Sequence, residues 1–400
     1  MQIDSPTTLD RDFIQDPHAL YRALRAQAPA HLVSMWGVLP VWLVTRHAEA
    51  RALLADSRLS KDGKRIAPML PPGTDALLGP SLRAHVLLTD PPDHTRLRKL
   101  SAKAFTARSV ERLRPRIVDI ANELLEDIPD GAADLVEAFA MPLPLRVISE
   151  MLGVPPADAV GFRACVEPML TKTDPKDLRD AELALAELLS ALIEHKRTSP
   201  ADDVLTSLVQ ASDDGDGFTE EELLSTAFLL ILAGYETTVN LIGSGIVALL
   251  RQPGQLAALR ADPSLLPGAI EEFLRFDSPI NISTVRVTAE DVHLDGVDIP
   301  ADSLVMIALL AANRDAEQFE DPDVLDITRK VNGHLAFGHG IHYCLGAPLA
   351  RLEGQVAIQR LLDTFDRITL DADVALRYRK SFLMRGLVSL PVNVHRASDE

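Results

Sequence analysis

The fold of this chain is decided by one stretch of sequence, His334-Leu335-Ala336-Phe337-Gly338-His339-Gly340-Ile341-His342-Tyr343-Cys344-Leu345-Gly346-Ala347-Pro348-Leu349-Ala350-Arg351. Glycines on both sides of Cys344 break the backbone, and a helical pattern starts again at Leu349. We therefore expect Cys344 on a loop that leads into the N-terminus of a helix. Unpaired backbone N–H groups and the positive end of the helix dipole favour a thiolate at such a place.

A lone cysteine has other interpretations, and the commonest is a small residue buried in the core. We interpret Cys165 in this way. The glycine spacing around Cys344 favours a metal ligand instead. Zinc is disfavoured, since no second cysteine or histidine pair with ligand spacing surrounds Cys344. A thiolate held on such a loop can ligate haem iron and donate electron density toward O–O cleavage.

The composition excludes several classes of protein. The 400 residues include 47% hydrophobic residues, which is enough for a large core, and the net charge of −18 argues against nucleic acid as a partner. Two cysteines far apart form no disulfide framework and fit a reducing compartment. The start of the chain carries no apolar signal core, and the apolar run Leu223–Tyr235 is too short to span a bilayer. We therefore expect a cytoplasmic protein that does not associate with a membrane.

Hydrophobic periodicity predicts a mainly α chain with small β-sheets. The helical segments are Pro17–Ala28, His47–Ala55, His94–Ala104, Ser109–Asp127, Leu178–Lys196 and Glu220–Leu250, the last opening with a capping-box pattern at Thr219-Glu220-Glu221-Glu222. The short strand-like segments are Val41–Thr45, Val292–Leu294, Leu304–Ile307 and Leu387–Val394. No break is long enough to be an interdomain linker, so we expect one domain over residues 1–400.

The cysteine stretch resembles the haem-binding signature of the cytochrome P450 family, Phe-x-x-Gly-x-His-x-Cys-x-Gly. Its specified positions are filled by Phe337, Gly340, His342, Cys344 and Gly346. The resemblance implies the cytochrome P450 fold, haem b as cofactor and Cys344 as the axial ligand of the iron. It also implies a set of residues around the cofactor, here Phe337, Gly338, His342 and Gly346.

A second motif, Ala233-Gly234-Tyr235-Glu236-Thr237-Thr238, interrupts an apolar helix with an acid and hydroxyl groups. The small residues Ala233 and Gly234 leave room for a flat cofactor and a diatomic ligand, and Thr237 shares the helix face of Ala233. Alone, the hexapeptide could also be a satisfied polar patch of a half-buried helix. It resembles the distal helix motif of the family, which implies that Glu236 and Thr237 relay protons during O2 activation by an enzyme fed with electrons by a reductase.

The two carboxylates of haem require cationic or hydrogen-bonding partners when buried. The segment Asp90–Arg98 is similar to the family segment whose histidine and arginine, four residues apart, face the cofactor, which implies His94 and Arg98. We expect Arg286 and His342 to complete the set. Taken singly, each of these residues is more often a surface residue.

Glu272 and Arg275 lie three apart on one helix face and resemble the structural Glu-x-x-Arg motif of the family. The family often adds a second arginine from a later Pro-rich loop, where this chain has Val324. We therefore expect either that another residue pairs with Glu272 or that the network is looser.

Basic residues gather between Arg96 and Arg116, against a single acid, Glu111. Such a run is often only a solvated face, but in an acidic protein it can steer an acidic electron donor. The resemblance implies a position on the proximal side of the haem, so we hypothesise that a ferredoxin, fed by a ferredoxin reductase, docks at Lys99, Arg108 and Arg112.

A substrate pocket is expected from the positions of these motifs, and its lining is mainly apolar, which indicates a bulky apolar small molecule. Each lining residue could equally be plain core. The expected residues are Leu82, Val86, Leu87, Leu229, Leu232, Ile280, Asn281, Ile282, Leu383 and Met384, with Asn281, Ser283 and Thr284 able to orient a polar group.

Hydroxylation or epoxidation of a macrolide, terpenoid or steroid-like natural product is the function that the resemblance implies, since the motifs look most similar to those of actinobacterial members acting on macrolide polyketides. Two alternatives differ in class. One is a protein that binds haem without catalysis, which the Glu236-Thr237 pair disfavours. The other is a hydrolase with Cys344 as nucleophile and His342 as base, for which no third orienting residue is evident.

Overall fold

The structure is a computed structural model that describes residues 7–35, 37–71, 83–102, 105, 107–171, 174–212, 217–330 and 333–397. The chain divides into two compact units. The first comprises Met1–Ser60, Ala121–Met141 and Thr237–Glu400, and the second comprises Lys61–Ile120 and Pro142–Glu236. Because each unit is assembled from separate segments, no single linker in the sequence marks a boundary. One domain over residues 1–400 stays a prediction.

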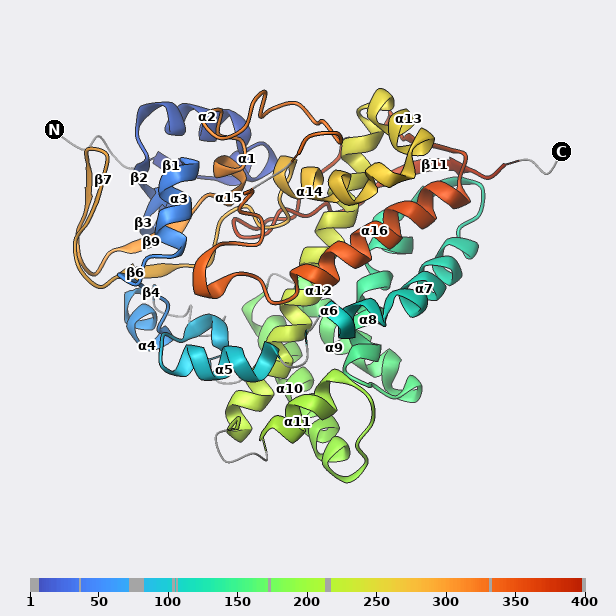
Figure 1. Ribbon diagram of the computed structural model, residues 1–400, viewed down its shortest axis with the longest axis horizontal. Coiled ribbons are helices and arrows are strands. Elements are labelled where there is room, and N and C mark those ends of the chain that lie inside the picture. The colour runs from blue at the N-terminus through green and yellow to red at the C-terminus, as the bar shows by residue number, and fades with distance from the viewer. Residues whose placement is uncertain are drawn as a thin grey trace. The chain divides into compact units, whose positions relative to one another are not determined.

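The first unit contains the β-structure. In the described residues its largest sheet has six strands in the order β1 (Thr7–Leu9), β2 (Ala30–Met35), β3 (Leu39–Val44), β9 (Leu304–Ile307), β6 (Arg286–Thr288) and β4 (Leu59–Ser60). The early strand β3 pairs in parallel with the late strand β9, with Trp42 opposite Val305, so Figure 1 shows blue and orange segments side by side. Val44, Val305 and Ile307 are fully buried and form part of the core beside this sheet.

Two smaller sheets complete the β-structure that the structure describes. One joins β10 (Arg367–Leu370), β11 (Pro391–His395) and β5 (Gly131–Asp134), all antiparallel. The other is the hairpin of β7 (Val292–Leu294) and β8 (Val297–Ile299), whose turn contains Gly296 with a φ of 83°. Glycine adopts this left-handed conformation without the steric cost of a side chain.

Helices of the first unit are α1 (Arg11–Gln15), α2 (His18–Gln27), α3 (His47–Leu54), α13 (Pro253–Ala261), α14 (Leu266–Phe276), α15 (Leu309–Ala312) and α16 (Ala347–Thr364). Helices α14 and α16 are in contact, and Figure 1 shows them next to each other. The second unit holds α4 (Gly63–Ile66), α5 (Asp93–Ala102), α6 (Ala107–Glu111), α8 (Pro142–Met151), α9 (Ala159–Thr171), α10 (Pro175–Thr198) and α11 (Val204–Ser212). Helices α7 (Arg114–Glu126) and α12 (Glu220–Leu250) contribute residues to both units.

Helix α12 begins where its capping box predicts. The Thr219 backbone N–H donates to the Glu222 carboxylate at 2.9 Å, and the Glu222 N–H donates to Thr219 Oγ1 at 3.2 Å. The helix then runs for 31 residues and is long and apolar enough to cross a membrane, with 61% of its most apolar window buried inside the protein. The run Leu223–Tyr235 was expected to be too short to span a bilayer. The helix that contains it is long enough, so this expectation was wrong about length. Its burial is typical of a core helix.

The predicted fold class is confirmed, and the bounds of α12, β7 and β9 agree with the prediction. Two other segments differ by more than three residues or are divided. The helix expected over Ser109–Asp127 is divided into α6 and α7, because Pro115 lacks an N–H and its ring opposes continuation from the preceding turn. The strand expected from Leu387 begins only at Pro391, and Leu387 forms an isolated bridge with Tyr378.

Candidate active site

The loop that carries Cys344 is fixed by its own backbone. The Cys344 N–H donates to the Phe337 carbonyl at 2.9 Å, and the Tyr343 N–H donates to the Gly340 carbonyl at 3.1 Å. Gly338 and Gly340 have φ angles of 73° and 75°, which disfavour residues with a Cβ. A Cβ on Gly340 would also lie 2.8 Å from the carbonyl oxygen of Leu54. These glycines therefore give the loop its shape.

Cys344 lies just before α16, whose N-cap is Gly346. Cys344 is half-buried. Cys165 is half-buried as well, so the interpretation of Cys165 as a residue buried in the core was wrong. The 18-residue helix presents its N-terminal N–H groups and positive dipole end near the sulfur, and both favour the thiolate. This donor set fits a thiolate-ligated haem, with one sulfur ligand on a rigid loop.

The Glu-x-x-Arg motif is buried and fully bonded. Arg275 donates to both carboxylate oxygens of Glu272 at 2.8 Å, and both side chains are 0% exposed. Arg329 adds a contact from its Nε to Glu272 Oε1 at 3.3 Å. The Asp326 N–H donates to the same oxygen at 3.0 Å. Another residue, Arg329, therefore pairs with Glu272, which confirms the first of the two expected alternatives, and the network is not looser.

Val324 contributes through its backbone instead. Its carbonyl oxygen accepts from Arg275 Nη2 at 3.1 Å, while its side chain is 54% exposed. Arg329 was not predicted, because it follows the Pro-rich loop instead of lying at the position of Val324. The signal was an arginine just after that loop, in Asp326-Ile327-Thr328-Arg329.

The proton-relay motif lies within α12, which is helical throughout its length. Ala233 is exposed, and Gly234, Glu236 and Thr237 are half-buried. Alanine and glycine leave this turn of the helix without bulky side chains, as a flat cofactor requires. Roles for Glu236 and Thr237 in proton transfer stay predictions.

The four residues expected to bind the haem carboxylates come from three elements. His94 is buried and Arg98 half-buried, one turn apart on α5 in the second unit. Arg286 is buried in β6 of the first unit, with Nη1 3.4 Å from both Ser283 Oγ and the Thr284 carbonyl. His342 is half-buried and ends the 3-10 turn η8 (Gly340–His342). Their role at the cofactor stays a prediction.

The basic run is less cationic than its sequence indicates, because acids of other elements pair with it. Arg96 forms an ion pair with Glu222 of α12. Further ion pairs join Arg112 with Asp202, Arg114 with Glu111, and Arg116 with Glu150. Lys99 is exposed and has no ion pair among the described residues, so it keeps its charge for a partner.

The structure brings four of the expected substrate residues together in the first unit. Ile280 and Met384 form an antiparallel bridge, and the Asn281 N–H donates to the Leu383 carbonyl at 2.8 Å. Ile280, Leu383 and Met384 are half-buried. The Asn281 side chain is engaged on both sides, since Oδ1 accepts from Tyr21 Oη at 2.7 Å and Nδ2 donates to the Phe382 carbonyl at 3.1 Å.

The other expected substrate residues lie elsewhere. Ile282 is fully buried in the core. Val86 and Leu87 form part of the 3-10 turn η4 (Val86–Leu88), and Leu229 and Leu232 are half-buried on α12. Leu82 lies outside the described residues. Contact of any of these side chains with a substrate stays a prediction.

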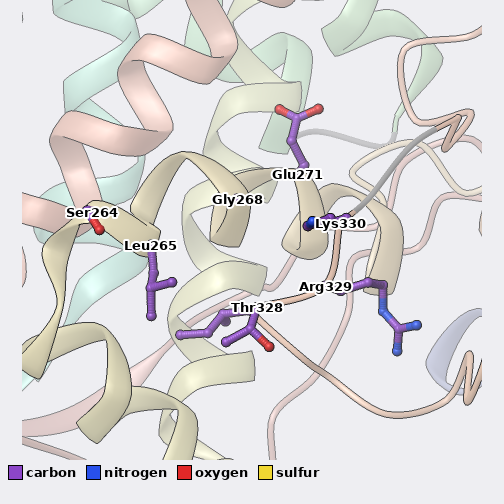
Figure 2. A pocket seen from close by; sticks show the side chains of 8 residues that line it. Ser264, Leu265, Gly268, Glu271, Thr328, Arg329 and Lys330 are labelled. Carbon is purple, nitrogen blue, oxygen red and sulfur yellow. The ribbon is translucent and has the colours of Figure 1, made fainter.

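A surface pocket of about 310 Å³ lies at the start of α14, and none of the residues expected to contact haem or substrate lines it. Figure 2 shows that the carboxylate of Glu271 and the guanidinium of Arg329 point in different directions. Glu271 accepts from Arg351, and Arg329 donates to the Glu320 carbonyl. The pocket is lined by Ser264, Leu265, Gly268, Glu271, Ile327, Thr328, Arg329 and Lys330.

Comparison with known proteins agrees with the geometry. The profile of the cytochrome P450 family matches residues 146–392. Cytochrome P450 107B1 of Saccharopolyspora erythraea is 49% identical, with 96% of each chain covered. The vitamin D(3) 25-hydroxylase of Pseudonocardia autotrophica is 48% identical, covering 96% of this chain and 94% of the relative. The structure of the tirandamycin C-bound P450 monooxygenase TamI superposes with a TM-score of 0.91 at 48% identity, covering 98% and 100% of the two chains.

The chain belongs to the cytochrome P450 family. It is a cytochrome P450 monooxygenase, a haem-iron oxidoreductase that uses O2, a redox partner and a small-molecule substrate, and it is similar to bacterial oxidisers of natural products. This result excludes the hydrolase and the non-catalytic haem carrier as alternatives.

Proposed function

We propose that this enzyme inserts one oxygen atom of O2 into a bulky, largely apolar natural product in the cytoplasm, by hydroxylation or epoxidation. Electrons come from a ferredoxin and its reductase. The observation that carries the proposal is Cys344, half-buried on a glycine-shaped loop at the start of α16, where the thiolate is favoured.

Haem b is the form of haem that the sequence favours. Covalent attachment of a c-type haem needs the pattern Cys-x-x-Cys-His, and the two cysteines of this chain lie at positions 165 and 344. Haem is therefore held by the thiolate and by non-covalent contacts. His94, Arg98, Arg286 and His342 supply the hydrogen bonds and positive charge for its carboxylates.

When bound, the haem supplies the oxygen activation, and the chain positions substrate and controls protons. Cys344 would hold the iron through its thiolate, which favours O–O cleavage. Glu236 and Thr237 would hold protons and transfer them toward the place where O2 binds. Ala233 and Gly234 keep side-chain volume away from the place where O2 binds.

The substrate class is supported by the relatives and by the residues. One relative is a vitamin D(3) 25-hydroxylase, and the monooxygenase TamI binds tirandamycin C. The half-buried apolar residues Ile280, Leu383 and Met384 offer contacts to a similar large apolar molecule. Titration with steroids and macrolactones should shift the haem absorption. Tighter binding of small polar compounds would contradict the substrate class.

The experiment that tests the central claim is the absorption spectrum of reduced protein exposed to carbon monoxide. We expect a strongly red-shifted Soret band for the wild type that is lost in Cys344→Ala. Cys165→Ala is the matched control, because this half-buried cysteine has no part in the site. A band that survives Cys344→Ala unchanged would remove thiolate ligation by this residue.

A further inference from the structure

Five side chains on the cysteine loop and on the helices next to it form a cluster that does not include Cys344. We call it the loop clamp, and it consists of Glu271, His334, Phe337, Tyr343 and Arg351. All five belong to the first unit, with Glu271 on α14 and Arg351 on α16. Neither Glu272, which pairs with Arg275, nor the residues expected to contact haem carboxylates belong to it.

We propose that Arg351, held in place by Glu271, is a positioning residue for Cys344 that sets how firmly the thiolate is presented to the iron. The proposal rests on the proposed function, in which Cys344 is the axial ligand.

The centre of the loop clamp is a two-point ion pair. Arg351 donates from Nε to Glu271 Oε1 at 2.6 Å and from Nη2 to Oε2 at 2.8 Å. Burial by itself would raise the pKa of Glu271, but hydrogen bonds from Arg351 and His334 outweigh it and lower that pKa to about 2. Glu271 therefore stays ionised, and can keep its pairing with Arg351, at pH values well above 2.

Arg351 transmits this restraint to the loop through two aromatic rings. Its guanidinium carbon lies 4.6 Å from the centroid of the Phe337 ring, which is a cation–π distance. Its Nη1 lies 3.5 Å from Tyr343 Oη, and the two rings are 6.2 Å apart. The carbonyl oxygen of Phe337 accepts the Cys344 N–H, so the contact that fixes Phe337 also fixes the backbone of the cysteine.

The beginning of the loop is tied to the same carboxylate. His334 Nε2 lies 3.0 Å from Glu271 Oε2, and its Nδ1 accepts the Ala336 N–H at 3.2 Å. Because Nδ1 is an acceptor, the neutral ring carries its proton on Nε2 and donates to Glu271. One carboxylate therefore restrains both ends of the segment from His334 to Cys344.

Arginine is required here by its shape. The planar guanidinium can bind a carboxylate at two points and lie over an aromatic ring at the same time, whereas the ammonium of lysine is a compact charge. Outer residues that orient a metal ligand commonly contribute 10- to 100-fold to metal affinity or activity, as an order of magnitude. We expect Arg351→Lys and Glu271→Gln to fall at the lower end of that range.

The test uses the haem-loaded enzyme and its carbon monoxide spectrum. In Arg351→Lys and in Glu271→Gln we expect roughly tenfold weaker retention of haem, and a larger share of the unshifted band that reports a lost or protonated thiolate. Arg360→Lys is the matched control, since Arg360 lies on the same helix and pairs with Asp363 at 3.0 Å, away from the loop. The double variant should be no worse than the worse single one, because both changes break one unit.

Melting curves separate positioning from general stability. A purely structural role would lower the melting temperature while leaving the shifted fraction of haem-bearing protein at the wild-type value, and this result would overturn the proposal. A wild type without any shifted band would instead overturn the ligation itself. A shifted band that depends on Cys344 but is indifferent to Arg351 and Glu271 would overturn the positioning role alone.

Discussion

Arg329 contacts Glu272 with its Nε 3.3 Å from Glu272 Oε1, although the two residues are 57 positions apart in the sequence. The Glu272 side chain is 0% exposed. A carboxylate so deeply buried needs every available donor, because an uncompensated buried charge is strongly destabilising. Arg275 supplies two hydrogen bonds, and Arg329 and the Asp326 N–H supply the rest.

Arg329→Ala should therefore lower the stability by about 1–3 kcal/mol, the cost of a buried group left partly unsatisfied. Arg275→Ala should cost more, about 3–5 kcal/mol, since it removes the main counter-charge. Thermal unfolding followed by circular dichroism measures both. Val324→Ala is the control and should stay within about 0.5 kcal/mol of wild type, because its side chain is exposed. An equal loss in Val324→Ala would show that the effect of Arg329→Ala does not come from its contact with Glu272.

Glu353 on α16 is a second buried carboxyl group, but its surroundings favour the protonated form instead of the ionised one. It is 2% exposed, and its Oε2 has no hydrogen-bond partner in the described part of the chain. Burial raises its pKa to about 8. The folded protein therefore keeps this proton between pH 4.5 and about 8 while the unfolded chain releases it, and over that window stability falls by about 1.4 kcal/mol per pH unit from this group.

Glu353→Gln removes the ionisation, so its melting temperature should exceed that of wild type at pH 8 and match it near pH 4.5. The exposed Glu317→Gln should leave the pH trend of the wild type unchanged. If wild type and Glu353→Gln keep a constant difference in melting temperature from pH 5 to pH 8, Glu353 does not carry the proton that its burial implies.

Lys99 belongs to the basic run. It is exposed and has no ion pair among the described residues. Lys99→Glu should slow reduction by an acidic ferredoxin several-fold at low salt, and the effect should shrink at high salt because the charges are then screened. Stopped-flow reduction of the enzyme measures the rate. Lys64→Glu reverses another exposed charge of the second unit and serves as control. Equal slowing by both variants would point to net charge rather than a docking site.

Thr237→Ala should uncouple oxygen consumption from product formation, since a hydroxyl that transfers protons is lost. We expect less product per O2 consumed and more hydrogen peroxide released, with haem content and substrate affinity retained. Thr226→Ala is a suitable control, because Thr226 is a buried threonine of the same helix whose hydroxyl has no hydrogen-bond partner among the described residues. Unchanged coupling in Thr237→Ala would assign the proton path to other groups.

The sequence predicted what local patterns encode. Helix α12 was placed correctly because the Thr219–Glu222 capping box marks its first turn. The position of Cys344 before a helix was predicted from glycines on either side. Strands as short as β4, with two residues, gave no alternating pattern to detect.

Pairing between distant segments was not predictable by the same reasoning. The acids that neutralise Arg96, Arg112 and Arg116 come from other elements, so counting charges within the run overestimated its positive field. Glu271 and Arg351 lie 80 positions apart, and only the packing of α14 against α16 brings them together. Asn281 has an amide side chain that could orient a ligand, yet this amide is hydrogen-bonded to Tyr21 and to the Phe382 carbonyl.

The interleaving of the two units limits how the enzyme can be recombined with its relatives. The chain passes from one unit to the other four times, after residues 60, 120, 141 and 236, and the second and fourth passages fall inside α7 and α12. A chimaera with a single junction must therefore mix parental sequences within at least one unit. Exchanging a whole unit requires several junctions at once, and two of them must splice a helix in register.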